Sequence, residues 1–428
     1  MQILLPYGKN GLPVNVPDDA DVITPKFVAG IPDESAGLIH ALRHPLFERP
    51  LRDIADQGDE TVIVFPDRSR PMPSSRVLPA ILSELSHLPP KSITLLNALG
   101  LHRPNSREEL TDMLGADIIG RYRIIQHNPE DKDMLVHLGR TSFGHEIWIN
   151  RIFLEARIKV LTGFIEPHFF AGFSGGPKAV MPGISGIETI MGNHEARMIT
   201  HPGATWGETQ NNPIYEEIAE VAEKVGPQFL VNVTLNRRRE ITGIFTGQWQ
   251  EAHRSGCSFV RKSAMCPVEA PYDIVVTSNA GFPLDASLYQ AVKGISAAAR
   301  IVRPGGTIIL AAACAEGMAG HDSFYSLLRS QTSPHALTSM IMEFRNTQRD
   351  QWQVQVLAQV LNRADVYLHS LLPEETVRSC HLQPVSDITL LLRQIRARAP
   401  QCRIAILPEG PETIPYITKE YNEQGIVS

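Results

Sequence analysis

The 428-residue sequence has no long hydrophobic run, because no stretch approaches the 18 apolar residues that a membrane-spanning helix needs. The first residues, MQILLP, also lack the basic and apolar regions of a signal peptide. The sequence also has no large excess of one charge. Its 40 basic residues are outnumbered by 46 acidic ones, so it lacks the basic surface that nucleic acid binding requires. We therefore expect a cytoplasmic protein that binds neither membranes nor nucleic acid and whose partners are small molecules.

Cysteine is also rare. The five cysteines are odd in number, widely spaced and without a CxxC pair, so the sequence predicts neither a disulfide framework nor a cysteine zinc site. We interpret them as reduced thiols of a cytoplasmic protein. They are Cys257, Cys266, Cys314, Cys380 and Cys402.

The apolar content and its periodicity indicate an α/β protein. With 43% apolar residues, the chain is long enough for two or three domains with buried cores. In the first half, short β-rich runs alternate with helical patterns, which predicts a sheet flanked by helices. The predicted strands cover residues 61–65, 92–96 and 158–162. A helix over 105–114 should open with Ser106 and Glu109 as a capping box, and another should run from Asn212-Pro213 to Gly226.

A second domain is predicted after residues 262–271, where periodicity is lost and two prolines occur. Residues 273–277 and 307–310 predict parallel strands of a Rossmann-like sheet. The early strand is not followed by GxGxxG, so a nucleotide-binding Rossmann site is disfavoured. We assign residues 1–268 to the N-terminal domain and 269–404 to the C-terminal one.

The stretch from 163 to 201 holds the densest group of candidate functional residues. It follows the strand at 158–162 and contains His168, a glycine-rich turn at 172–176 and Lys178. Such a loop at a strand's end can offer backbone N–H groups to a phosphate, or it can be only a tight turn. It is not a Walker A site, because Pro177 replaces the last glycine and Ala179 the serine or threonine.

A helix is expected to follow this loop. Ser185 and Glu188 form a capping-box pattern, and apolar residues recur at helical spacing up to Met198. This spacing puts His194 on the apolar face, where it is either a core histidine bonded to a carbonyl or a metal ligand. The residues alone leave both interpretations open.

Several phrases, taken together, resemble a known family. The phrase EPHFFAGFSGGPKAVMPG, from Glu166 to Gly183, and the later GNH are similar to the signature of the lactate racemase (LarA-like) family of nickel-pincer-dependent 2-hydroxyacid racemases and epimerases. Further matching segments follow the same order from about residue 60 to the C-terminus. They are residues 67–70 (DRSR), 100–104 (GLHRP), 283–285 (PLD), 289–294 (YQAVKG) and 351–353 (QWQ).

The resemblance implies a cofactor and the residues that hold it. Lys178 would bind the nickel-pincer nucleotide, Ni(II)-pyridinium-3,5-bisthiocarboxylic acid mononucleotide, through a covalent thioamide. His194 would be the protein ligand of a square-planar nickel, a geometry that nickel(II) accepts. Four further residues would line the cofactor site: Asp67, Arg68, Ser69 and Arg70. Without the resemblance, they would indicate only a strand-end turn with a surface salt bridge.

The resemblance also implies catalytic and substrate-binding residues. His102 and His168 would alternate as base and acid for the hydroxyl on opposite sides of the substrate. Gln290 and Lys293, three apart on a helix, would bind its carboxylate and hydroxyl, although such a pair is commonly a solvated face. Two aromatic residues would shape the pocket, Tyr289 and Trp352; Trp352 is equally compatible with a core position.

The implied function is that of a 2-hydroxyacid racemase, similar to lactate racemase, which passes the Cα hydride to the cofactor through a 2-keto acid. The substrate could also be malate, phenyllactate, or a longer aliphatic or sugar acid, because these share the reacting atoms. Cofactor-biosynthesis proteins would be needed for maturation. A zinc metallohydrolase would need three protein ligands, and a binding protein without turnover is the third alternative. The family architecture further implies that residues 405–428 complete the first domain and that the active site lies in the cleft between the domains.

Overall fold

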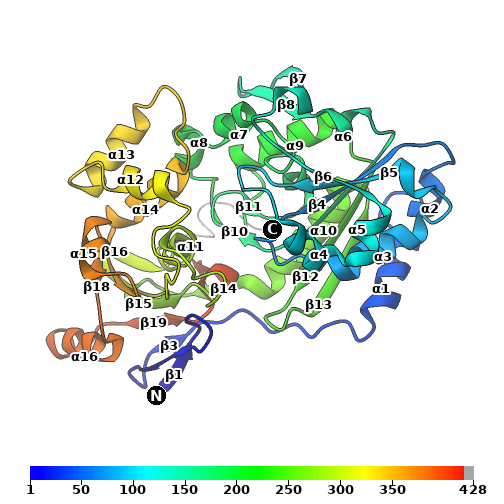
Figure 1. Cartoon of the computed structure of the whole chain (residues 1–428). Coiled ribbons are helices and arrows are strands. Elements are labelled where there is room, and N and C mark those ends of the chain that lie inside the picture. Colours follow the sequence, from blue (N-terminus) through cyan, green and yellow to red (C-terminus); the bar gives the residue numbers. More distant parts are fainter. Residues whose placement is uncertain (419–428) are drawn as a thin grey trace. The chain divides into compact units, whose positions relative to one another are not determined.

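The computed structural model describes residues 1–418, which form two compact units. Unit 2 contains residues 27–194 and 202–261, and unit 1 contains residues 1–26, 195–201 and those from 262 onward. Both are α/β, as the sequence predicts, with a six-stranded sheet and flanking helices in each (Figure 1).

The sheet of unit 2 has the strand order β13-β12-β9-β4-β5-β6. All neighbours are parallel except the edge strand β13, which pairs antiparallel with β12. The three strands predicted in this half of the sequence are confirmed as β4, β5 and β9. The strands are β4 (Thr61–Pro66), β5 (Ile93–Ala98), β6 (Arg123–Gln126), β9 (Ile158–Phe164), β12 (Phe229–Leu235) and β13 (Ile241–Gly247), and two small hairpins add β7 (Leu135–Arg140), β8 (Glu146–Asn150), β10 (Pro167–His168) and β11 (Gly172–Phe173).

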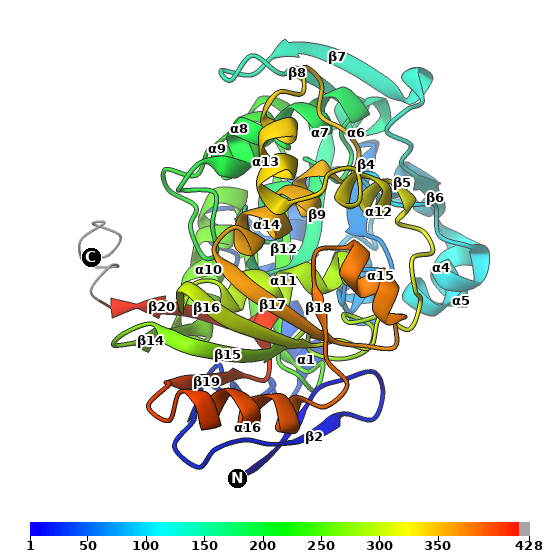
Figure 2. The same ribbon diagram turned by 90° about the vertical axis from the view of Figure 1, so that its left-hand side faces the viewer.

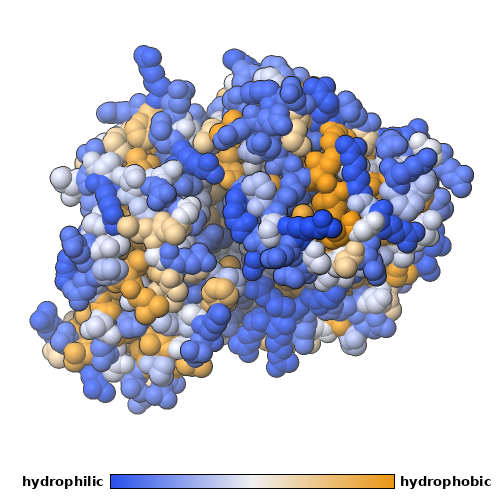
Figure 3. Space-filling model, viewed as in Figure 1, coloured by the Kyte–Doolittle hydropathy of each residue, from blue (hydrophilic) through white to orange (hydrophobic). Residues whose placement is uncertain are grey.

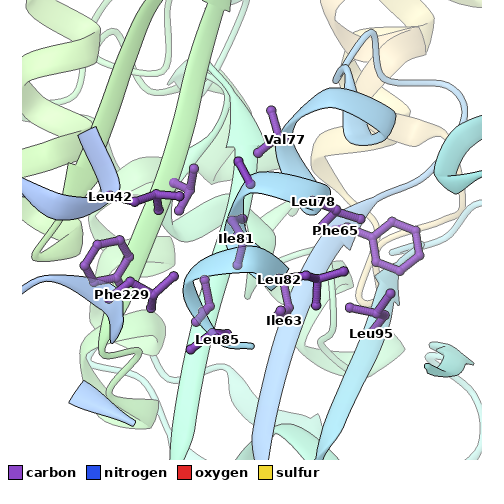
Figure 4. Packing of buried hydrophobic residues seen from close by; sticks show 14 of the residues in the cluster. Leu42, Ile63, Phe65, Val77, Leu78, Ile81, Leu82, Leu85, Leu95 and Phe229 are labelled. Carbon is purple, nitrogen blue, oxygen red and sulfur yellow. The ribbon is translucent and has the colours of Figure 1, made fainter. Parts of the chain in front are cut away.

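The main core of unit 2 lies between this sheet and helix α3. Val77, Leu78 and Ile81 of α3 face Ile63 and Phe65 of β4, and all five are fully buried (Figure 4). Apolar burial of this kind stabilises a fold by about 25 cal/mol per Å². The helices are α1 (Glu34–Arg43), α2 (Leu51–Ile54), α3 (Ser74–Glu84), α4 (Arg107–Leu114), α5 (Ala116–Arg121), α6 (Arg151–Glu155), α7 (Ile187–Asn193), α9 (Pro213–Val225) and α10 (Trp249–Ala264), with 3-10 turns η1 (Pro90–Ser92), η2 (Lys132–Met134) and η3 (Gly176–Ala179).

Three helix ends in unit 2 follow the predicted local signals. Ser106 accepts from the Glu109 backbone N–H at the start of α4, and the Glu109 side chain accepts from the N–H of Ser106, which makes the capping box. Asn212 accepts from the N–H of Tyr215 at the start of α9, and Gly226 ends that helix in the left-handed conformation.

The sheet of unit 1 is parallel throughout, in the order β18-β17-β16-β15-β19-β3. The parallel strands predicted at 273–277 and 307–310 are confirmed as β15 and β16. The strands are β1 (Gln2–Leu5), β2 (Leu12–Asn15), β3 (Asp21–Val22), β14 (Met265–Val268), β15 (Tyr272–Ser278), β16 (Val302–Ala311), β17 (Ala364–His369), β18 (Gln383–Pro384), β19 (Ile404–Leu407) and β20 (Ile414–Ile417).

The helices of unit 1 cover its parallel sheet. Helix α16 and the β1–β2 hairpin lie on one side of it (Figure 2), where Leu5, Val14 and Leu392 join the apolar cluster of β15 and β19. The helices are α8 (Ala196–Thr200), α11 (Leu288–Ala298), α12 (Asp322–Leu328), α13 (Pro334–Met342), α14 (Gln351–Leu361), α15 (Glu374–Ser379) and α16 (Ile388–Arg398), with the 3-10 turn η4 (Gly410–Glu412).

The two ends of the chain differ from the expected domain assignment. The first 26 residues belong to unit 1, because β3 pairs with β19. Strand β19, expected to return the chain to the first domain, pairs with β15 instead, and β20 pairs with β14. These pairings join segments more than a hundred residues apart, which no local pattern indicates. Residues 419–428, also expected to complete the first domain, lie outside the described residues.

The surface in the view of Figure 3 is mainly hydrophilic, with apolar residues in separate patches. Within residues 1–418, the longest and most apolar helices still fall short of what crossing a membrane requires.

Candidate active site

Asp67 and His102 meet at one edge of the sheet of unit 2. Asp67 follows β4 and His102 follows β5, and these strands are parallel neighbours, so their carboxyl ends lie side by side. Nδ1 of His102 lies 2.6 Å from Oδ2 of Asp67. The other oxygen, Oδ1, accepts from the backbone N–H of Ser69 at 2.6 Å. Asp67 is buried, whereas His102 is exposed enough to reach a ligand.

The charge of Asp67 fixes the tautomer of His102. Burial by itself would raise the pKa of Asp67, but the hydrogen bond and charge of His102, the charge of Arg70 and the Ser69 bond together lower it to about 2. An ionised carboxylate only accepts, so Nδ1 of His102 carries a proton and, in the neutral ring, Nε2 carries the lone pair. His102 is thus oriented as a proton acceptor through Nε2.

Glu109 ties together the loops that follow β4 and β5. Its carboxylate accepts from Arg68 at 2.8 Å and from both terminal nitrogens of Arg103 at 2.6 and 2.8 Å, besides capping α4. The hydrogen bond of Arg103, the capping N–H of Ser106 and the bond of Arg68 lower the pKa of Glu109 despite some desolvation. Arg68 and Ser69 are exposed and Arg70 is half-buried. The predicted cofactor-lining segment is therefore a rigid turn with two cationic side chains.

His168 lies on the short hairpin β10–β11, paired with Gly172. The ring is buried, and its Nδ1 accepts from the backbone N–H of Ala171 at 3.2 Å. In the neutral ring the proton is then on Nε2, the reverse of His102. The Phe170 ring packs edge-on against His168 at 4.6 Å between centroids.

The glycine loop, residues 172–178, brings Lys178 to the same region. Gly172 has φ +76°, and a Cβ there would lie 2.0 Å from the carbonyl oxygen of Glu208, so only glycine fits. The loop ends in η3, where Nζ of Lys178 lies 5.9 Å from the centroid of the Phe170 ring. Just beyond it, the carbonyl oxygen of Gly183 accepts from Gly100 at 3.0 Å, which joins this region to the loop that carries His102.

His194 ends helix α7 and is buried. Its Nδ1 donates to the carbonyl oxygen of Ile190 at 3.0 Å. Burial and, to a smaller extent, the positive charge of Lys178 lower the pKa of His194, and the bond to Ile190 opposes them; the net effect is a pKa of about 3. The ring is therefore neutral with its lone pair on Nε2, which is the form that binds metals. Phe170 contacts this ring too, at 5.3 Å, and is the common neighbour of His168, Lys178 and His194.

The helix expected from Ser185 to Met198 is wrong in two respects. The Ser185 hydroxyl donates to the carbonyl oxygen of Val180 at 2.9 Å and Glu188 pairs with Lys132, so the capping box does not form and α7 starts at Gly186 as N-cap. The helix also ends before His194, and a separate helix, α8, begins after it. The chain passes from unit 2 to unit 1 at this break.

A nickel cofactor fits the residues present in unit 2. His194 offers a neutral imidazole nitrogen, and Lys178 offers an amine that lies against the same Phe170 ring. Within residues 1–418, no group of three or more His, Cys, Asp or Glu side chains could hold a metal ion. A metal at His194 would take its other ligands from a bound cofactor, and the three protein ligands of a metallohydrolase are not gathered among residues 1–418.

The predicted substrate residues all lie in unit 1. Tyr289, Gln290 and Lys293 are half-buried on or beside the first turns of α11. The ring of Tyr289 stacks on His321, with centroids 4.3 Å apart and an interplanar angle of 8°. Trp352 is only 7% exposed, near the start of α14.

The sequence did not indicate which residues support these groups, and it predicted Asn212 only as the start of a helix. Helix α9 supplies three of them: Asn212 donates to the carbonyl oxygen of Phe170 at 2.9 Å, Tyr215 contacts His253, and Glu217 accepts from Asn193, next to His194, at 3.0 Å. Glu217 is fully buried and also bonds to His145 at 2.8 Å. The one available signal was polar residues inside a strongly apolar helix pattern.

Comparison with known proteins is consistent across sequence and structure. Residues 7–207 match the lactate racemase N-terminal domain and residues 268–414 the lactate racemase C-terminal domain. The chain is 32% identical to the lactate racemase of Thermoanaerobacterium thermosaccharolyticum, over 96% of this chain and 98% of that protein. It is 33% identical to the lactate racemase of Lactiplantibacillus plantarum, over 86% and 88%.

The structural matches agree with these relatives. The lactate racemase apoprotein from T. thermosaccharolyticum matches with a TM-score of 0.90, covering 97% of this chain and all of that one. A protein from Thermotoga maritima, 18% identical, shares the fold with a TM-score of 0.69. The fold, the site and these relatives define a racemase, in the isomerase class of enzymes. Within that class, this chain belongs to the lactate racemase family.

Proposed function

We propose that this protein racemises lactate and that it does so with a nickel-pincer nucleotide attached to Lys178. The observation that carries the proposal is that a buried His168, the loop lysine and a neutral His194 all contact Phe170 in unit 2. The oriented imidazole of His102 lies on a loop that is bonded to this region through Gly100 and Gly183. The family membership supports it, because the relatives named lactate racemase extend over nearly the whole chain.

The cofactor would be held by residues that differ in chemistry. Lys178 would form the covalent bond, and Nε2 of His194 would bind the nickel. The segment from Asp67 to Arg70 would line the site, with the Arg70 guanidinium able to fork onto a phosphate. When bound, the cofactor would supply a reversible acceptor for the hydride on the substrate's Cα.

Proton transfer at the substrate hydroxyl would be the task of the two histidines. His102 would accept the proton at Nε2, while Asp67 holds Nδ1–H and balances the charge that forms. His168 needs a proton on Nδ1 in either role, as base or as acid, and so must release the Ala171 N–H. Leaving the buried Ala171 N–H without its acceptor costs about 1–3 kcal/mol, which is small beside a catalytic barrier.

The substrate's carboxylate would be bound by Lys293 and its hydroxyl by Gln290, which share one face of α11. Tyr289 and Trp352 would bound the space for the side chain of the acid. A change of one methylene in such a pocket changes binding by about 1–3 kcal/mol, so longer aliphatic acids, phenyllactate or malate are the competing substrates.

We further propose that the enzyme works in the cytoplasm, where proteins that make the cofactor mature it. All five cysteines are buried thiols outside any disulfide among the described residues, which suits a reducing compartment.

The test is a panel of single-enantiomer 2-hydroxy acids, followed by chiral chromatography with the enzyme matured in the presence of the cofactor-making proteins. We expect lactate to racemise fastest, the intact mass to show an adduct, and Lys178→Ala to lose both adduct and activity. Protein made without maturation should be inactive. An unchanged lactate enantiomer with matured, adduct-bearing enzyme would refute lactate as the substrate, and an adduct persisting on Lys178→Ala would refute the attachment site.

A further inference from the structure

His253, on α10, lies beneath the glycine loop and is 1% exposed. Its Nε2 donates to the carbonyl oxygen of Ser174 at 3.0 Å, and its Nδ1 lies 3.0 Å from the hydroxyl of Tyr215 on α9. A carbonyl oxygen only accepts, so Nε2 carries the ring proton and Tyr215 donates to Nδ1. The ring thus joins the loop to two helices in a single orientation.

The loop is shaped around this ring. Gly176 has φ +53°, and a Cβ there would lie 2.4 Å from Cγ of His253, so the imidazole fills the space that a side chain at 176 would need. From the other side, Oδ1 of Asn232 on β12 accepts from the Gly176 N–H at 2.7 Å. The residue two positions before Lys178 is therefore held between α10 and β12.

Ser174 is fixed by more than one bond. Its hydroxyl donates to the carbonyl oxygen of Phe164 at the end of β9 and accepts from the Glu166 N–H, both at 2.9 Å. The backbone carbonyl of Ser174 accepts the hydrogen bond from His253. Removing it would leave the Ser174 carbonyl buried without its donor, which is costly.

The ring also lies within electrostatic reach of Lys178. Burial lowers the pKa of His253, the bond to Ser174 opposes this, and the positive charge of Lys178 adds to the lowering; the net effect is a pKa of about 4. At neutral pH the ring is uncharged, so it supports the loop without repelling the lysine ammonium.

We propose that His253 is a positioning residue for Lys178: through the Ser174 carbonyl and its fit against Gly176, it holds the glycine loop in the conformation that presents the lysine amine for covalent attachment. This inference rests on the proposed function of Lys178. His253 acts through the loop and needs no contact with substrate or cofactor.

Two substitutions of His253 test which of its ring nitrogens the glycine loop requires. The amide nitrogen of glutamine can take the place of Nε2 and donate to Ser174, whereas that of asparagine takes the place of Nδ1 and leaves the Ser174 carbonyl without its donor. His127 provides a matched control in the same unit: it is also 1% exposed and bonds through Nε2 to a backbone carbonyl, that of Ser185, at 2.9 Å. His127→Asn thus removes a comparable bond outside the glycine loop.

The first readout is the fraction of protein with the adduct on Lys178, measured by intact mass after maturation. We expect His253→Asn to lower it roughly tenfold, the scale of one buried hydrogen bond, and His253→Gln to restore it to near wild type. His127→Asn should keep the wild-type fraction although its thermal midpoint falls as far as that of His253→Asn. Equal fractions in His253→Asn and wild type would overturn the proposal, as would an equal loss in His127→Asn.

The second readout needs no cofactor and so separates this inference from the proposed function. Apoprotein is treated with limiting acetic anhydride, and peptide mass spectrometry compares acetylation of Lys178 with that of the exposed Lys91. We expect this ratio to change at least roughly threefold in His253→Asn and to stay at the wild-type value in His253→Gln and His127→Asn. A wild type without adduct refutes the covalent attachment alone, while an unchanged ratio in His253→Asn refutes the role of His253.

Discussion

His102 donates from Nδ1 to Oδ2 of Asp67 at 2.6 Å, across the ends of two neighbouring strands. Asp67→Asn removes the charge that fixes this tautomer, so His102 should no longer present a lone pair at Nε2 reliably. We expect kcat to fall on the order of 100-fold or more, the usual contribution of a positioned base. The measurement is racemisation by chiral chromatography, with circular dichroism to check that the fold is intact. Activity within a factor of about three of wild type would remove Asp67 from the mechanism.

His168→Gln keeps a hydrogen-bond donor near the position of Nε2 but cannot transfer a proton. The rate of net racemisation should therefore fall by at least about 100-fold. A single turnover from one enantiomer, measured as pyruvate after a rapid quench, should survive because His102 serves that face. Racemisation at the wild-type rate would show that His168 is only a buried ring.

Two glycines of the same backbone class should respond differently to alanine. Gly172 and Gly226 both have positive φ, but a Cβ at Gly172 would lie 2.0 Å from a backbone oxygen, whereas at Gly226 it meets no described atom within 4 Å. We expect Gly172→Ala to cost about 3 kcal/mol or more in the free energy of unfolding and Gly226→Ala about 1 kcal/mol. Urea unfolding of the two variants measures these losses. Equal losses of unfolding free energy would contradict the argument that Gly172 is crowded by a backbone oxygen.

Acid should begin to destabilise the protein at a pH higher than that at which its carboxylates become protonated. Burial lowers the pKa of three histidines, to about 4 for His127 and His253 and about 3 for His194. The unfolded chain protonates them near pH 6.5, so it binds more protons than the folded state below that pH, and stability falls from about pH 6.5 toward pH 4. Each group adds up to about 1.4 kcal/mol per pH unit.

The measurement is the urea midpoint of the apoprotein at several pH values. His127→Gln should reduce the slope between pH 4 and 6.5 by up to one proton. Asp67, with a folded pKa of about 2, contributes stability that is present above about pH 4 and lost only as the pH falls toward 2. A flat profile from pH 6.5 to 4 would contradict the burial of neutral histidines.

Substrate deuterated at Cα should keep its label. In the proposed mechanism the histidines would exchange only the hydroxyl proton with water, so lactate racemised in ordinary water should retain deuterium in both enantiomers. A primary isotope effect is expected if hydride transfer limits the rate. Mass spectrometry of the separated enantiomers measures this, and rapid loss of deuterium would mean that Cα–H leaves as a proton.

Local signals in the sequence predicted the features that short segments determine. The Ser106–Glu109 capping box and the Asn212 start of α9 depend on neighbours three residues away, and both are confirmed. The Ser185–Glu188 pattern is equally local but wrong, because a carbonyl at Val180 and a lysine at 132 take the two side chains. A propensity for a cap loses when tertiary contacts offer the same groups other partners.

The candidate site could be predicted from the sequence only in part. The predicted strands at 61–65 and 92–96 put Asp67 and His102 after strand ends, but no sequence pattern indicated the hydrogen bond between them. His253 is far from Ser174 in sequence and shares with it no motif, so its contact with the glycine loop follows only from the packing of α10. The pairing of β3 with β19 is likewise non-local and rests on two residues of each strand.

The start of α9 fixes the spacing of three segments of the candidate site, because three of its residues contact them. Asn212, Tyr215 and Glu217 reach, directly or through His253, the chain beside His168, the loop of Lys178 and the residue before His194. One inserted residue between Asn212 and Glu217 would turn the later contacts by about 100° around the helix axis. The number of residues between Asn212 and Glu217 is therefore under tighter constraint than the identity of the exposed residue among them, Glu216.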